Sequence, residues 1–242
     1  MDLDVDINID ILETNSPFVS YKIPIVSYLL KEYNNINNTL ITIIDNIEKF
    51  YINTKYNTIN DGDGKTNTKS ILTHNYKNFN IFDHTEYESI NILKNFVSNS
   101  YEHYITNFIP ESSFNLDVYK NNNKYKNSIG INCWGNKLGR YDYLDKHTHR
   151  YSLDNLLPSG NYFVRSPGHE TYTKYYHPLT IFKNNAHILP NTEGALTLFP
   201  NFIYHMTSPN RSLNSYRYTL GMDCYVRDVT REREKCVVSL FD

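Results

Sequence analysis

The chain has 242 residues, a formal net charge of −2 and 40% hydrophobic residues, with 22 Tyr and 12 Phe. This length suits one domain, the large aromatic side chains can build its core, and a near-neutral chain has no strong field to attract an anionic membrane. The three cysteines are too few for a disulfide framework, the acidic start is unlike a signal peptide, and the apolar stretch 23–30 is too short to cross a bilayer. We therefore expect a soluble, cytoplasmic protein.

The first dozen residues alternate between two kinds of side chain. Leucine, valine and isoleucine occupy the odd positions 3–11, and aspartate or asparagine occupies the even positions 2–10. This alternation predicts a half-buried strand with its apolar face inward and its charged face outward. We expect it at a sheet edge, because a row of aspartates discourages pairing with another chain.

Two segments with helical spacing follow. Apolar residues recur every three or four positions over 38–51 and again from Asp83 to Ile109, where Pro110 ends the pattern. Asp83 or Thr85 can cap the second helix. The polar stretch 57–70 between them contains glycines and acids out of register for a phosphate or calcium loop, so it predicts a surface loop.

From about residue 115 the pattern becomes all-β. Short strands divided by proline, glycine and asparagine turns are typical of a sandwich or jelly roll. We expect a single domain: an N-terminal strand and supporting helices over 1–114, a β core over 115–226, and a C-terminal tail over 227–242 whose residues 227–235 are charged and exposed. The expected strands are 129–134, 141–149, 162–165, 179–182, 195–199, 203–207 and 216–226.

Two histidine motifs lie within this β region. His147 and His149 are separated by one residue, and alternate residues of a strand point to the same face, so both imidazoles can converge on one point. A third histidine, His205, ends the block Gly194–His205, and Arg217 follows near the start of the last strand.

Together these motifs resemble the 2-oxoglutarate/Fe(II)-dependent dioxygenases. The resemblance covers about residues 128–226 and is strongest for a group of oxygenases common in phages and large DNA viruses, which share an H-x-H, an SG-x-YY and a G-x-L-x-x-FP-x-x-x-x-H block. The matching segments here are His147–His149, Ser159–Phe163 and Gly194–His205, with Trp134 ahead of the site. The resemblance implies a double-stranded β-helix (jelly roll) that binds Fe(II), with 2-oxoglutarate as cosubstrate, O2 as oxidant and ascorbate in support. It also implies a virus-encoded protein that acts in a host cytosol.

The resemblance also implies roles for individual residues. His147, His149 and His205 would be the catalytic metal ligands, three facial ligands that leave sites for a 2-oxo acid and dioxygen. Most relatives have a carboxylate where His149 stands, so the alternatives are a three-histidine site or a third ligand from Asp145 or Asp154. The insertion Arg150–Pro158 is a further departure from the pattern.

Cosubstrate binding is expected around Arg217. Its guanidinium, placed on the wall opposite the metal, can hold the distal carboxylate of 2-oxoglutarate, and Thr219 points the same way with a hydroxyl group. If the strand phases hold, Asn132 and Tyr162 also point into the cavity. We expect the remaining histidines to be structural residues of the helices or to lie in surface loops.

The expected activity is hydroxylation of a C–H bond, in a protein side chain such as a prolyl residue or in a small molecule, with release of succinate and CO2. The substrate itself is not specified by the sequence, and the lack of a basic aromatic stripe argues against duplex nucleic acid as a partner. Two alternatives stay open: a cupin-like three-histidine metalloenzyme that does not use 2-oxoglutarate, and a catalytically silent jelly-roll binding protein.

Overall fold

The computed structural model describes residues 5–13, 22–53, 66–67, 70–75, 78–110, 114, 129–149, 157–178, 186–226 and 238–239. Within them the protein is mainly β, with antiparallel sheets, as expected. Its strands are β1 (Val5–Glu13), β2 (Lys22–Leu30), β3 (Thr66–Asn67), β4 (Ile129–Leu138), β5 (Tyr143–Leu144), β6 (Pro158–Arg165), β7 (Tyr172–Tyr176), β8 (Ala186–Pro190), β9 (Ala195–Pro200), β10 (Tyr204–Thr207), β11 (Arg217–Val226) and β12 (Val238–Ser239).

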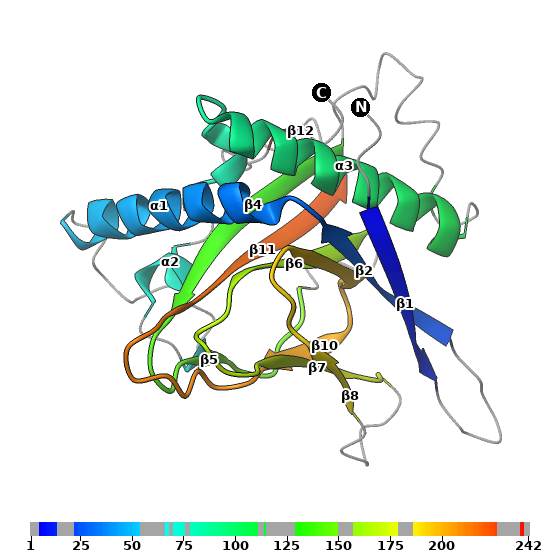
Figure 1. The fold of residues 1–242 in the computed structure, drawn as a ribbon. Helices are drawn as coiled ribbons and strands as arrows, with labels where there is room; N and C mark the ends of the chain where they lie inside the picture. The colour runs from blue at the N-terminus through cyan, green and yellow to red at the C-terminus, as the bar shows by residue number, and fades with distance from the viewer. Residues whose placement is uncertain are drawn as a thin grey trace.

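Two sheets face each other and form the jelly roll. The larger has seven strands in the order β1-β2-β9-β6-β11-β4-β12, and the smaller has the order β10-β7-β8. From β6 to β11 the chain passes back and forth between the two sheets, so the fold winds as a double-stranded β-helix (Figure 1). This topology confirms the fold class that the β-rich half predicts.

Two long helices cover the outer face of the larger sheet (Figure 1). They are α1 (Tyr33–Ile52) and α3 (Glu88–Phe108), and between them lie the short helix α2 (Ile71–His74) and the 3-10 helix η2 (Ile81–Asp83). Their apolar faces bury Leu40, Ile44 and Phe96 against the sheet, in the main core. Both helices are therefore confirmed, although α1 begins at Tyr33 and the N-cap of α3 is Tyr87, without a side-chain cap.

The N-terminal strand lies at the sheet edge, as predicted, but the prediction of its buried face is wrong. Ile7, Ile9 and Ile11 are 45%, 49% and 44% exposed, whereas Asp10 approaches His187 at 3.6 Å. Pairing sets this orientation: Asp10 lies opposite Ile25 of β2, which faces the smaller sheet. Alternation defines the two faces of a strand, and the register with its neighbour decides which one turns inward.

Several strands differ from the expected boundaries. β4 and β6 are longer than predicted, the expected strand 141–149 is reduced to β5, and β2, β3, β7, β8 and β12 were not predicted. β7 reads YTKYY and lacks the aliphatic residues that mark strands. The expected strand 179–182, the tail 227–235 and most of the loop 57–70 lie outside the described residues. Among the helices that the structure describes, none has the length and apolar character needed to cross a membrane.

Candidate metal centre

The two sheets bring three histidines together at one end of the barrel. The backbones of His147 and His205 pair directly, with N–H to O distances of 3.0 and 2.9 Å, so their side chains lie side by side. The ring centroids of His147 and His205 are 4.2 Å apart, and Nε2 of His149 lies 3.3 Å from Nε2 of His205. One ligand atom from each ring lies within 4.8 Å of the others, which is close enough for one metal ion.

The outer nitrogen of each imidazole is held by an oxygen. Nδ1 of His147 lies 2.6 Å from the Asp145 carbonyl oxygen, Nδ1 of His205 lies 3.1 Å from the Ile203 carbonyl oxygen, and Nδ1 of His149 lies 2.6 Å from Oδ1 of Asp223. An oxygen acceptor requires a proton on Nδ1, and this leaves the lone pair on Nε2 of the neutral ring. All three Nε2 atoms are thereby set up as metal ligands.

Asp223 is a site residue that the sequence analysis did not identify. It lies in the middle of β11, is buried, and accepts hydrogen bonds from both His149 and Ser159, the latter at 2.8 Å. A carboxylate behind a ligating imidazole fixes the ring and raises its basicity. The sequence signal for this role is an aspartate inside the apolar segment LGMDCYV. A carboxylate is almost never buried without a partner, so this pattern predicts a polar or charged group beside Asp223.

Burial has a strong effect on His205. Desolvation lowers the pKa of His205 well below its usual value, and repulsion from His147 and His149 lowers it further. His205 therefore stays neutral, with its Nε2 lone pair available, at pH values where an exposed histidine is protonated.

Trp134 closes one side of the histidine cluster. Its indole stacks on His149 with ring centroids 5.7 Å apart and an interplanar angle of 25°. Gly221, opposite Trp134 on the neighbouring strand β11, makes room for it: a Cβ at Gly221 would lie 2.5 Å from the indole Cε2. A side chain at position 221 would therefore displace the ring that packs against His149.

Arg217 lies farther along the same face of β11 and is completely buried. Its Nη1 donates to the Ser208 carbonyl oxygen at 2.8 Å and its Nη2 donates to Oγ1 of Thr207 at 2.7 Å, while Nε has no partner. Among the described residues no carboxylate lies within ion-pair distance of Arg217, and desolvation lowers the pKa of Arg217 to about 10. A buried cation without a counter-ion favours the binding of an anion.

A small cavity of about 80 Å³ connects these groups. Its lining includes His147, His149 and His205 at one end and Asn136 and Thr207 at the other. Arg217 does not line it directly but reaches it through Thr207. Thr219, two residues after Arg217, accepts a hydrogen bond from Asn136 at 3.4 Å, and Thr73 donates to Asn136 at 2.9 Å.

The structure does not bring all the expected residues to this cavity. Asn132 lies opposite Asp223 and so shares its face, although it is not among the lining residues. The expected orientation of Tyr162 is wrong: its hydroxyl donates to Asn37 of α1 at 2.8 Å, and its ring packs on Phe96 of α3. The neighbouring residue, Asn161, faces the cavity instead.

Of the two alternative third ligands, the structure describes only Asp145, and its carboxylate does not join the cluster. The Asp145 side chain is exposed and accepts from the Lys146 backbone at 2.7 Å, so its carbonyl oxygen, rather than its carboxylate, serves the site. Asp154 lies outside the described residues. Of the other histidines, His103 contacts Tyr28, His84 contacts Glu86 and His169 contacts the Arg211 backbone, away from the cluster.

Comparison with known proteins finds similarity only at the level of structure. No protein-family model matches the chain, and no curated protein matches it. A prolyl-4-hydroxylase of Pseudomonas putida has a TM-score of 0.32 and 15% identity over 40% of this chain and 51% of that one. A 2OG-Fe(II) oxygenase family oxidoreductase from Burkholderia pseudomallei has a TM-score of 0.34 and 12% identity over 48% of this chain and 58% of that one.

A prolyl hydroxylase from Trichoplax adhaerens, solved with a hypoxia inducible factor peptide fragment, has a TM-score of 0.40 and 11% identity over 79% of both chains. Vicilin from hazelnut (Corylus avellana) is similar at the same level, with a TM-score of 0.30 and 8% identity over 45% of this chain and 30% of that one, so the structural neighbours include proteins other than prolyl hydroxylases and 2OG-Fe(II) oxygenases. The matched part spans little more than half of the first two proteins. Likenesses at this level define no activity or substrate for this chain.

Proposed function

We propose that this protein is an Fe(II)- and 2-oxoglutarate-dependent oxygenase. The observation that carries the proposal is the cluster of three imidazoles, whose Nε2 atoms converge while each Nδ1 is held by an oxygen. In the proposed reaction one oxygen atom of O2 enters a C–H bond of the substrate and the other enters succinate, as 2-oxoglutarate loses CO2. The sequence resemblance to oxygenases of phages and large DNA viruses points the same way.

The residues of the cluster fit Fe(II). Neutral imidazole nitrogens suit divalent iron, and three ligands on one side leave positions open for a cosubstrate and dioxygen. His147, His149 and His205 would hold the ion, and Asp223 would hold His149 in place. When bound, the metal would act as a Lewis acid and as a source of electrons for the reduction of O2.

The polar end of the small cavity supports the cosubstrate assignment. Arg217 is a buried cation whose hydrogen bonds in the described structure go to neutral oxygens only. A carboxylate near Thr207 would neutralise this charge, while the 2-oxo acid end of the same molecule reaches the metal. Arg217, Thr207 and Thr219 would therefore orient 2-oxoglutarate, and Trp134 would keep water away from one side of the site.

The experiment combines a binding readout with a turnover readout. Trp134 is the single tryptophan of the chain and stacks on His149, so its fluorescence should change when Fe(II) is added without oxygen. With O2, 2-oxoglutarate and ascorbate, the purified protein should then release succinate, even without a known substrate.

His147→Ala and His205→Ala should lose both signals, because two remaining neutral ligands hold a divalent ion weakly. His103→Ala, which changes a histidine away from the cluster, should keep both. Wild-type protein that binds no Fe(II) would refute the proposal and favour a silent jelly-roll binding protein.

One observation favours a second candidate. Among the described residues no carboxylate joins the three imidazoles, since His149 occupies that place and the Asp145 side chain is exposed. A cupin-like three-histidine enzyme that does not use 2-oxoglutarate would have the same shell. It would bind Fe(II) but release no succinate, and Arg217→Gln would leave its activity unchanged.

A further inference from the structure

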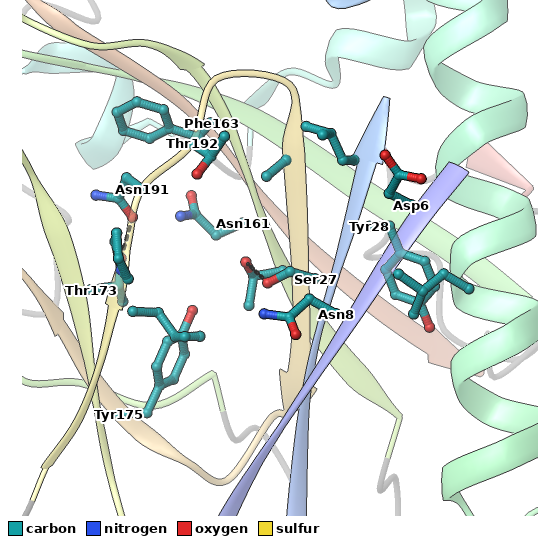
Figure 2. Close-up of a pocket in the computed structure, with 16 residues that line it drawn as sticks. Asp6, Asn8, Ser27, Tyr28, Asn161, Phe163, Thr173, Tyr175, Asn191 and Thr192 are labelled. Carbon is teal, nitrogen blue, oxygen red and sulfur yellow. Dashed lines mark hydrogen bonds between the residues drawn. The ribbon is translucent and has the colours of Figure 1, made fainter. Parts of the chain in front are cut away.

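A second, larger cavity lies between the two sheets, beside the candidate metal centre. Its volume is about 310 Å³, within the range of pockets that hold small organic ligands. Figure 2 shows the polar side chains that surround it, among them Asn8, Ser27, Asn161, Thr173 and Asn191. We call it the inter-sheet cavity.

The floor of the inter-sheet cavity is a row of small polar side chains on adjacent strands of the larger sheet. Asn161 of β6 lies opposite Thr197 of β9, Thr197 lies opposite Ser27 of β2, and Ser27 lies opposite Asn8 of β1. Residues in register point to the same face, so the four side chains line one path across the sheet. Between them, Ser27 and Thr197 share a hydrogen bond of 2.9 Å.

The same row continues to the metal centre. Asn161 lies opposite Gly221 of β11, and Gly221 lies opposite Trp134, which stacks on His149. Asn161 and Thr173 line both the inter-sheet cavity and the small cavity at the histidines. A ligand in the inter-sheet cavity would therefore lie next to the space in front of the metal.

The smaller sheet provides the roof, which is polar and aromatic. Thr173 donates to Asn191 at 3.0 Å, and Tyr175 stands beside them with its ring 6.0 Å from that of His205 (Figure 2). On the floor, the Asn161 side chain makes no hydrogen bond to a described residue, so its amide donor and carbonyl acceptor are free for a ligand.

Charge is nearly absent from this lining. Among the described residues around the inter-sheet cavity, Asp6 is the only charged one, and it stands at the exposed sheet edge near Lys31, at 3.6 Å. An anionic ligand would lose hydration without gaining an ion pair, whereas amide and hydroxyl groups would find partners of their own kind.

We propose that the inter-sheet cavity binds the organic substrate, and that this substrate is an uncharged small molecule that carries amide or hydroxyl groups. The inference rests on the proposed oxygenase function, since it places the oxidised C–H bond at the end of the cavity marked by Asn161 and Thr173. It disfavours an anionic substrate, because no cationic side chain stands among the described residues that line the cavity.

The test uses pairs of probes that differ in charge. Ligand-observed NMR with the Fe(II)-loaded protein, kept free of oxygen, would measure binding of thymidine and thymidine 5′-monophosphate, N-acetylprolinamide and N-acetylproline, and glucose and glucose 6-phosphate. At least one uncharged probe should bind, and at least about tenfold more tightly than its charged counterpart.

Two variants locate the binding. Thr197→Leu, which fills the floor of the cavity, should weaken binding of the probe at least about tenfold. Thr197→Val, which keeps the shape and loses the hydroxyl group, should weaken it about threefold or more. Thr42→Leu makes the same change at an exposed position of α1 and should have no effect. If Thr197→Leu fails to fold, the Thr197→Val result decides.

Three outcomes would overturn the inference. Either no uncharged probe binds, or a charged probe binds as tightly as its uncharged counterpart, or every Thr197 variant that folds binds the probe as tightly as the wild type. Failure of the proposed function is separate, because it appears as absence of Fe(II) binding or succinate release in the wild type. A protein that is active but fails the probe test retains its function and loses only this substrate assignment.

Discussion

At the scale of single residues, the candidate metal centre depends on a carboxylate that stands behind the histidine cluster. Asp223 joins His149 at 2.6 Å and Ser159 at 2.8 Å inside the core. Its negative charge favours a proton on Nδ1 of His149 and so a lone pair on Nε2. The three imidazoles of the cluster carry no negative charge, and Asp223 would partly compensate for the charge of a divalent metal bound there.

The first prediction is that Asp223→Asn weakens Fe(II) binding by about 10–100-fold, the usual effect of removing such a partner. The fluorescence of Trp134 during an anaerobic Fe(II) titration measures it. Asp45→Asn, which changes a carboxylate on α1 that pairs with Lys137 at 2.9 Å, is the control. Equal Fe(II) affinities of wild type and Asp223→Asn would show that Asp223 only supports packing.

The second prediction concerns Arg217. Arg217→Gln should raise the apparent constant for 2-oxoglutarate strongly, since removing one partner of a buried charge pair costs about 3–5 kcal/mol. Fe(II) binding should persist, because Arg217 contacts Thr207 and Ser208 and no histidine of the cluster. Succinate release at increasing 2-oxoglutarate concentrations measures the effect, with the exposed Arg211→Gln as control. An unchanged constant would favour the three-histidine enzyme that uses no 2-oxoglutarate.

At the scale of elements, strand β11 organises the centre. Its inner face presents Arg217, Thr219, Gly221 and Asp223 in succession, and pairing with β4 places Asn136 and Trp134 beside them. Pairing with β6 on the other side brings Ser159 to Asp223. One central strand therefore aligns the proposed anion site, the indole contact and the carboxylate behind His149.

The third prediction compares two glycines on this strand pair. Gly221→Ala should shift Trp134 and weaken Fe(II) binding, because the added Cβ would lie 2.5 Å from the indole. Gly135→Ala crowds Ile44 on the helix side, with a Cβ at 2.7 Å, and should reduce stability without moving Trp134. Tryptophan emission and thermal unfolding separate the two effects. If both variants change the emission equally, the contact with Gly221 has no special role.

At the scale of the whole molecule, burial of His205 makes stability depend on pH. Burial lowers the pKa of His205, so between its folded value and its unfolded value near 6.5 the unfolded chain binds more protons than the folded one. The contribution of His205 to the free energy of unfolding therefore rises with pH through this interval. It is fully present above about pH 6.5 and decreases as the pH falls toward the folded pKa. Metal loading should follow the same direction, because three imidazoles must be deprotonated.

The fourth prediction is that the metal-free protein has a smaller free energy of unfolding at about pH 5.5 than at about pH 7.5. Urea unfolding in the presence of a chelator at the two pH values measures the difference. His205→Gln should reduce this difference, since it removes the group whose pKa burial lowers. A His205→Gln variant with the wild-type pH dependence would assign the effect to other groups, such as His177, whose pKa burial also lowers.

Much of the fold was accessible from local patterns. Helical spacing located α1 and α3, and the short strands after residue 129 predicted the jelly roll. The spacing of His147 and His149, together with the block that ends at His205, predicted the residues that the structure brings together. These features depend on neighbours in sequence or on a recurring motif, so the chain alone contains them.

Other features required the tertiary structure. The alternation of β1 was clear, but its pairing with β2 turned Asp10, rather than the isoleucines, toward the smaller sheet. The phase of β6 likewise turned Tyr162 to the helices and Asn161 to the cavities. A two-residue alternation in the sequence defines the two faces of a strand. Only the segments that pack on those faces, which lie far away in the chain, decide which face is buried.

The sequence by itself thus determined the class of fold and the three histidines, because periodicity and motif spacing are local properties. Only the tertiary structure decided that Asp223 stands behind His149, that buried Arg217 has no acidic partner among the described residues, and that Asn161, Thr197 and Ser27 form one row. Each of these depends on the register between strands far apart in the chain. Register follows from the packing of the whole core, which no short stretch of sequence specifies.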